Sequence, residues 1–249
     1  MLSSVGWAAL GVGFIFLMTS LGAASVLFCR EDTLPKSQTG MMGFAGGVMT
    51  AATVWSMLLP AIEQTRSEGT LPCWLPAAAG TAAGAAFLCA IDALILRLRR
   101  GGSAEKSSML MTAITLHNIP EGMAVGLAFA LSGGADGLTA AAALALGIGV
   151  QNVPEGAAVS LPLRRMGMSR GRAFSMGVLS GAVEPLFGML AVMAVSGISR
   201  IMPWLLGFSA GAMLYVVVCE LIPAADDRRG LFWYIAGFLL MMILDVALG

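Results

Sequence analysis

The chain has 249 residues, of which 58% are hydrophobic and 11% charged, and its 14 basic residues equal its 14 acidic residues in number. Together with a mean hydropathy of +0.87, this composition excludes an ordinary soluble domain and indicates an integral membrane protein embedded in the lipid bilayer. The zero net charge gives no reason to expect a nucleic-acid partner.

Eight apolar segments are long enough to cross a bilayer, which takes about 20 residues in a helix. In chain order we expect them at about residues 5–29, 40–62, 73–96, 108–131, 138–163, 172–195, 200–222 and 231–248. The longest polar connections are only about ten residues, so we expect one all-α transmembrane domain over residues 1–249. The first segment has no basic residues before it and no small-residue cleavage site after it, so we interpret it as a retained span.

The basic residues are distributed unevenly between the loops. Twelve of the fourteen lie in alternate loops, and only Arg66 and Arg200 lie in the others. The twelve are Arg30, Lys36, Arg97, Arg99, Arg100, Lys106, Arg164, Arg165, Arg170, Arg172, Arg228 and Arg229. Because cytoplasmic loops retain Lys and Arg, this pattern predicts an even number of spans. It also predicts that both termini lie on the periplasmic or extracellular side of the cell's inner or plasma membrane.

Internal repeats relate the spans to one another. HNIPEGMAVGL at 117–127 and QNVPEGAAVSL at 151–161 are identical at seven of eleven positions. A weaker repeat relates span one to span six, through GAASVLF (22–28) and GAVEPLF (181–187). Another relates span two to span seven, through GFAGGVM (43–49) and GFSAGAM (207–213) and through MLLPA (57–61) and ELIPA (220–224). This pattern predicts a 3+2+3 arrangement, in which spans 1–3 and 6–8 are inverted repeats around an antiparallel central pair, spans 4–5. Such repeats place a binding site near the bilayer midplane and favour transport by alternating access.

Four glutamates, Glu121, Glu155, Glu184 and Glu220, lie well inside the predicted spans. A charged residue there costs about 2.5 to 3.5 kcal/mol on insertion scales and usually serves ions or protons. The sequence places no Lys or Arg at the same depth. The four carboxylates therefore indicate a metal ion or protons. Asp92 and Asp245, near span ends, are expected to pair or snorkel, and Asp92 and Glu220 are candidates for the permeation path.

The repeated motif places metal-ligand side chains on one face of each central helix, because residues three or four apart lie on one face. The set comprises His117, Asn118 and Glu121 on span four and Gln151, Asn152 and Glu155 on span five. Pro120 and Pro154 each deprive an earlier carbonyl of its helical hydrogen bond, which is tolerated at membrane depth where the backbone lines a polar cavity. One imidazole with carboxylates and amides suits Zn(II), Fe(II) or Mn(II) better than Cu(I).

These paired motifs, the eight spans and the outward termini closely resemble the ZIP (Zrt/Irt-like) divalent metal transporters, in particular their bacterial GufA-like branch, over essentially the whole chain. The resemblance implies uptake of zinc, with cadmium, iron(II) and manganese as further substrates, into the cytoplasm by a protein that is often a homodimer. It also implies a binuclear metal site between spans two, four, five and six. Spans one, four, five and six would move as a transport unit against the other four.

Carried over to this sequence, the resemblance implies that one metal is held by Met57, His117, Glu121, Gln151 and Glu155. The second metal would share Glu121 and Glu155 and add Asn118, Asn152 and Glu184. Many relatives have aspartate where this chain has Asn152, so the second site lacks one negative charge here. The metal is cargo, and no cofactor is expected.

Two other functions fit the sequence less well. An intramembrane zinc protease would need the two histidines of H-E-x-x-H, and the chain has one histidine in total, so no enzymatic activity is expected. A proton-coupled carrier of a small organic solute is the alternative, because buried Glu and His also form proton relays. The central motifs offer oxygen ligands, however, and no deep Arg or Lys for an organic anion.

Overall fold

The computed structural model describes residues 3–28, 34–98 and 104–248, except for the side chains of 34–38, 95–96, 98, 104–114, 116–117, 195–199 and 248. All regular structure in these ranges is helical. The elements are α1 (Ser4–Phe28), α2 (Leu34–Ala52), η1 (Thr53–Leu58), α3 (Leu59–Glu68), α4 (Leu75–Leu98), α5 (Ala104–Leu131), α6 (Gly134–Arg165), α7 (Arg170–Gly181), α8 (Val183–Met193), α9 (Val195–Val216), η2 (Val217–Leu221), α10 (Ile222–Ala224) and α11 (Arg228–Leu248).

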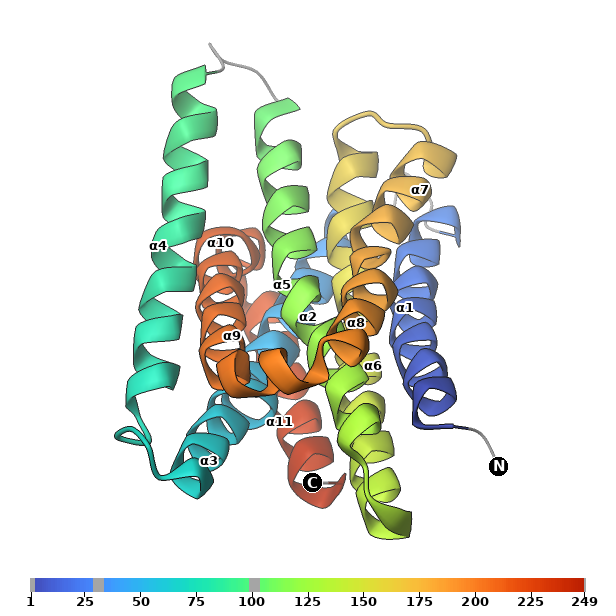
Figure 1. Cartoon of the computed structure of the whole chain (residues 1–249). Coiled ribbons are helices and arrows are strands. Elements are labelled where there is room, and N and C mark those ends of the chain that lie inside the picture. Colours follow the sequence, from blue (N-terminus) through green and yellow to red (C-terminus); the bar gives the residue numbers. More distant parts are fainter. Residues whose placement is uncertain (1–2, 29–33, 99–103, 249) are drawn as a thin grey trace.

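The helices follow the predicted spans. Within the described residues, seven helical stretches are long and apolar enough to cross a membrane, and they coincide with seven of the eight predicted spans. The other predicted span, 108–131, falls within α5, where Asn118–Leu131 is a shorter apolar helix. The chain is therefore an all-α integral membrane protein, as predicted. α1 begins and α11 ends at the same end of the bundle, opposite the turn between α6 and α7 (Figure 1).

Two spans contain a π-helical segment that ends just before a proline. In η1 the backbone N–H of Leu59 donates to the carbonyl of Val54, and after η2 that of Ile222 donates to Val217, five residues back in each case. Pro60 and Pro223 cannot donate to the carbonyl four residues earlier, and the wider turn accommodates this loss. The two segments end within the repeated MLLPA and ELIPA, so both copies of the repeat follow the same distortion of the backbone. By contrast, α5 and α6 continue as α-helix through the prolines of the central motifs.

The sixth predicted span is interrupted where the candidate ligand Glu184 lies. A turn at Ala182 separates α7 from α8. Pro185 has no N–H to donate to the carbonyl of Gly181, so one helical hydrogen bond is missing at this point. Glu184 consequently lies in the first turn of α8, where unsatisfied N–H groups and the positive end of the helix dipole favour a negative side chain.

The helices pack as two groups. In the first group, α1 packs along α6 and α5 along α8, with α7 against α1 and α6. In the second group, which contains all the other elements, α2 packs along α11 and α4 along α9. The groups meet mainly where α5 contacts α9 and where α2 contacts α6. In Figure 1, α1, α7 and α8 lie on one side of the bundle and α4 and α9 on the other.

In the first group, α1 and α6 approach to backbone contact. A Cβ atom on Gly22 would overlap the carbonyl oxygen of Val153 and lie 2.8 Å from its carbonyl carbon. A Cβ atom on Gly156 would overlap the carbonyl oxygen of Thr19 and lie 2.8 Å from the nitrogen of Ala23. Small residues allow membrane helices to pack this closely. The contact brings α1 against the QNVPEG motif.

Candidate metal site

The predicted ligand residues whose side chains are described lie in the interior of the protein. Seven of the eight have described side chains, and all seven are fully buried. They are Met57 in η1, Asn118 and Glu121 in α5, Gln151, Asn152 and Glu155 in α6, and Glu184 in α8. His117 lies on α5, and its side chain is outside the described residues. Buried polar groups need partners, so the contacts of these side chains show what the site can bind.

The two repeated motifs face each other across α5 and α6. The side-chain amide of Gln151 donates a hydrogen bond to Glu121 Oε1. The side-chain amide of Asn118 lies within hydrogen-bonding range of the Glu155 carboxylate. Each motif therefore supplies an amide to the glutamate of the other motif, and the structure brings these four residues together.

A second set of contacts joins α6 to α8 through α1. The Thr19 hydroxyl donates to Glu184 Oε1 over 2.7 Å and accepts from Asn152 Nδ2 over 3.0 Å. Asn152 Nδ2 also lies 3.4 Å from the carbonyl oxygen of Ile15. Glu155 lies close enough to Glu184 for the two acidic groups to interact electrostatically, and a nearby cation would stabilise both as carboxylates.

Several of these side chains have one polar atom held by protein and another that is not. Asn118 Nδ2, for example, donates to the carbonyl oxygen of Ser180 over 3.2 Å. Among the residues that the structure describes, no hydrogen-bond partner is present for the buried oxygens Asn118 Oδ1, Gln151 Oε1, Asn152 Oδ1 and Glu184 Oε2. Such atoms are rare in proteins. Because all four are acceptors, the cluster suits a cation.

The described acidic side chains do not by themselves form a metal cage. Within the described part of the chain, no three His, Cys, Asp or Glu side chains converge closely enough to hold a metal ion. A metal here would therefore depend on amide oxygens, on His117 or on Met57. The Met57 side chain belongs to the main apolar core, and its segment η1 contacts α6.

The two candidate pathway residues lie in the second group of helices. Asp92 of α4 accepts a hydrogen bond from the Tyr215 hydroxyl of α9 over 2.9 Å. Glu220 lies half-buried in η2, at the position that Met57 occupies in η1. Asp245 accepts from the Ser56 hydroxyl over 3.0 Å. Asp92 and Asp245 thus each pair with a hydroxyl group.

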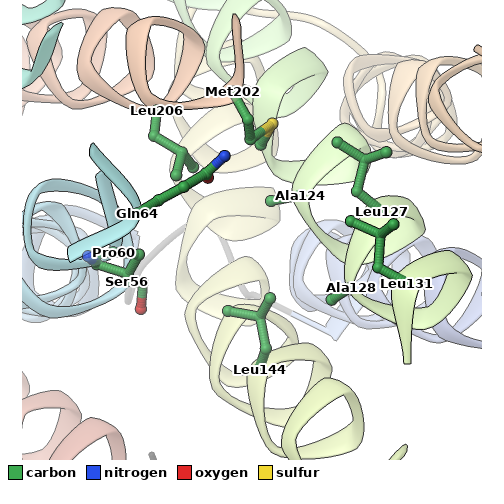
Figure 2. Close-up of a pocket in the computed structure, with 10 residues that line it drawn as sticks. All are labelled: Ser56, Pro60, Gln64, Ala124, Leu127, Ala128, Leu131, Leu144, Met202 and Leu206. Carbon is green, nitrogen blue, oxygen red and sulfur yellow. The ribbon is translucent and has the colours of Figure 1, made fainter. Parts of the chain in front are cut away.

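A cavity of about 220 Å³ lies between α3, α5, α6 and α9. Figure 2 shows Gln64 reaching across it from α3 toward Leu206 of α9. The lining residues are Ser56, Pro60, Gln64, Ala124, Leu127, Ala128, Leu131, Leu144, Met202 and Leu206. The lining is mainly apolar, and Ala124 is three residues beyond Glu121, so the cavity comes within one helical turn of the first motif.

Sequence reasoning missed Thr19. A threonine in an apolar helix commonly bonds to the carbonyl four residues earlier, and Thr19 Oγ1 does lie 3.2 Å from the Ile15 carbonyl oxygen. Its contacts with Asn152 and Glu184 arise because α1 packs on α6 and α8. No motif or spacing in the sequence marks these contacts.

Known proteins match this chain over most of its length. The sequence profile described as ZIP Zinc transporter matches residues 99–245. The chain is 35% identical to zinc transporter ZIP11 of Homo sapiens, over 99% of this chain and 98% of that protein. It is 38% identical to zinc transporter GufA of Myxococcus xanthus, over 93% of this chain and 94% of that protein. It is 37% identical to zinc transporter ZIPB of Bordetella bronchiseptica, over 98% of this chain and 82% of that protein. The chain therefore belongs to the ZIP family of metal transporters, in its GufA-like branch.

Proposed function

We propose that this protein carries zinc into the cytoplasm and binds it with the buried carboxylate and amide oxygens of α5, α6 and α8. Membership of a transporter family makes the chain a metal-ion transporter and not an enzyme. The relatives named above are zinc transporters by name, which supports zinc as the cargo. The observation that carries the proposed site is the set of four buried oxygen acceptors that have no partner among the described residues. A cation supplies the electrostatic partner that such atoms need.

The proposed site holds two metals. The first would be bound by Met57, His117, Glu121, Gln151 and Glu155, and the second by Asn118, Asn152 and Glu184 together with Glu121 and Glu155. The contact between Gln151 and Glu121 supports the first set. The shared contacts of Asn152 and Glu184 with Thr19 support the second set.

Transport would proceed by movement of the first group of helices against the second. The predicted repeats pair span one with six, two with seven, three with eight, and four with five. When each span is replaced by its repeat partner, the packing of α1 on α6 corresponds to that of α8 on α5. In the same way, the packing of α2 on α11 corresponds to that of α9 on α4. This correspondence supports inverted repeats and therefore alternating access.

Met57 belongs to the second group, whereas the other proposed ligands belong to the first. Movement of the first group would therefore take the metal away from the Met57 sulfur and weaken its binding. Weak, changeable coordination suits a carrier, because a closed structural zinc site holds its metal too tightly to release it. Asp92 and Glu220, on helices that run toward the predicted cytoplasmic side, would then receive the released ion.

Metal uptake into proteoliposomes loaded with a fluorescent chelator tests this proposal. We expect saturable zinc uptake that cadmium inhibits, with slower uptake of manganese and iron(II), and no uptake into protein-free liposomes. Replacing His117 and Glu155 together with alanine is expected to reduce uptake to the protein-free level, because both metals lose ligands. If no metal enters under any gradient or pH, the proposal is wrong and the organic-solute carrier becomes the better hypothesis.

The inward direction of transport depends on the orientation predicted from the basic residues. In a variant without the four native cysteines, Gly171→Cys places a thiol in the exposed first turn of α7, and Ser67→Cys places one at the exposed end of α3. In intact cells, a membrane-impermeant maleimide should label Ser67→Cys and should label Gly171→Cys only after permeabilisation. The opposite labelling pattern would contradict import.

A further inference from the structure

We propose that Thr19, which is not among the predicted metal ligands, positions the second metal site. Its hydroxyl holds the amide nitrogen of Asn152 and one carboxylate oxygen of Glu184, and so leaves the amide oxygen of Asn152 and the second oxygen of Glu184 to the metal. The inference rests on the proposed function and assigns α1 a part in metal binding.

The hydrogen bonds of Thr19 have a defined direction. The Thr19 hydroxyl has a single proton, and its Oγ1 lies 2.7 Å from Glu184 Oε1 but 3.2 Å from the Ile15 carbonyl oxygen. The shorter bond to a carboxylate is the stronger, so the proton goes to Glu184. Oγ1 then acts as the acceptor for Asn152 Nδ2 at 3.0 Å. Asn152 thus donates to Thr19, and Thr19 donates to Glu184.

This direction determines which atoms are left for a metal. Asn152 has a donor and an acceptor at its tip, and only the acceptor can bind a cation. Because Nδ2 is held by α1, Oδ1 is the remaining atom, and it is buried without a partner among the described residues. Glu184 Oε2 is left in the same way. Without the Thr19 hydroxyl, the Asn152 amide nitrogen would lose its shorter contact with α1 and keep the 3.4 Å contact with the Ile15 carbonyl oxygen, so its orientation would be less well defined.

The chemistry of this contact also suits asparagine at position 152. An ionised aspartate could only accept, so it would compete with Glu184 for the single proton of Thr19. Asn152 instead supplies a second hydrogen-bond donor, so the Thr19 proton remains available to Glu184. The network therefore accommodates a neutral residue at position 152.

Close packing keeps the Thr19 side chain in place. A Cβ atom on Gly181 would lie 2.8 Å from the Thr19 methyl group and 3.2 Å from Glu184 Oε1. A Cβ atom on Gly156 would overlap the Thr19 carbonyl oxygen. The methyl group thus occupies the space beside Gly181, and the hydroxyl is held toward Asn152 and Glu184. All of these residues belong to the first group of helices, so the network would stay intact while that group moves.

The experiment is a cadmium titration of the full-length protein, purified in detergent, by isothermal titration calorimetry, with bound metal counted by mass spectrometry. We expect two metals on the wild type. Thr19→Val, which keeps the shape and removes the hydroxyl, should weaken the second metal at least about tenfold, as losses of outer-shell partners do, and leave the first unchanged. Thr19→Ser keeps the hydroxyl and should restore the second metal.

The alternative is that Thr19 is only a packing residue. Two metals bound to Thr19→Val as tightly as to wild type would overturn the proposal, and so would equal weakening of both sites. Thr19→Ala, which adds no volume, repeats the test if the valine variant does not fold. If neither variant without the hydroxyl folds, Thr19 is a structural residue and the proposal is wrong. A wild type that binds one metal also overturns it, whereas a wild type that binds and transports none overturns the proposed function itself.

Discussion

Replacing Glu121 with alanine is expected to abolish metal transport while the protein stays folded. Glu121 is fully buried, accepts from Gln151, and is proposed to be shared by both metals. Loss of this carboxylate would remove a ligand and a negative charge from both sites at once. Outer-shell partners alone typically contribute tenfold to 100-fold in metal affinity, so we expect affinity to fall at least about 100-fold and zinc uptake to reach the protein-free level.

Folding should survive this substitution because alanine favours helix and its main penalty is one unsatisfied amide of Gln151, which costs about 1 to 3 kcal/mol. Size-exclusion chromatography and circular dichroism in detergent check this expectation, and chelator-loaded proteoliposomes measure uptake. Glu63→Ala is the matched control, since Glu63 is an exposed glutamate of α3 and its variant should transport normally. If Glu121→Ala shows saturable uptake at the wild-type rate, Glu121 is not a ligand that transport needs, and the proposed site is wrong.

Replacing Gly22 with alanine is expected to destabilise the protein strongly although it adds a single methyl group. That group would overlap the Val153 carbonyl oxygen and lie 2.8 Å and 3.0 Å from the Val153 carbonyl carbon and Cα. These are backbone atoms of α6, which cannot rotate away as a side chain could, so α1 and α6 must separate. Overpacking typically costs about 1 to 3 kcal/mol and occasionally more; at the upper end, the melting temperature should fall by roughly 10 °C.

Gly13→Ala is the matched control for this prediction because it makes the same change on the same helix. Gly13 is exposed, and a Cβ atom there meets nothing within 4 Å. Alanine in an open helical position is expected to be neutral or to stabilise by about 0.5 to 1 kcal/mol. Melting curves in detergent compare the two variants. Equal melting temperatures would mean that α1 and α6 are not in backbone contact.

The sequence alone determined the spans and the residue types of the candidate site. Lipid offers no hydrogen-bond partners to backbone N–H and C=O groups. An apolar run of about 20 residues that crosses the bilayer therefore forms a helix, which pairs these groups within the segment. Seven of the eight predicted spans accordingly coincide with described helices that are long and apolar enough to cross a membrane. The residues of the candidate site were identifiable because a buried carboxylate is costly, and Glu121 and Glu155 occur in a motif that the chain repeats.

Helical spacing also predicted which residues share a face, but it could not predict the partners across helices. That Gln151 contacts Glu121, and Asn118 reaches Glu155, depends on the mutual rotation of α5 and α6. The turn at Ala182, which places Glu184 in the first turn of a new helix, was not predicted either. A proline in a membrane helix is compatible with a continuous helix, a π segment or a break, and this chain contains all three.

Only the tertiary structure decided that α1 contacts two residues of the proposed site. Its mainly apolar sequence indicates that the helix crosses the membrane. It does not show which helices α1 packs against, because most neighbouring helices are similarly apolar. The choice comes from close packing at Gly22 and Gly156, which lets α1 reach the backbone of α6. At that distance the hydroxyl of Thr19 reaches Asn152 and Glu184. Hydropathy does not encode this contact, because it depends on the shapes of two helices far apart in the chain.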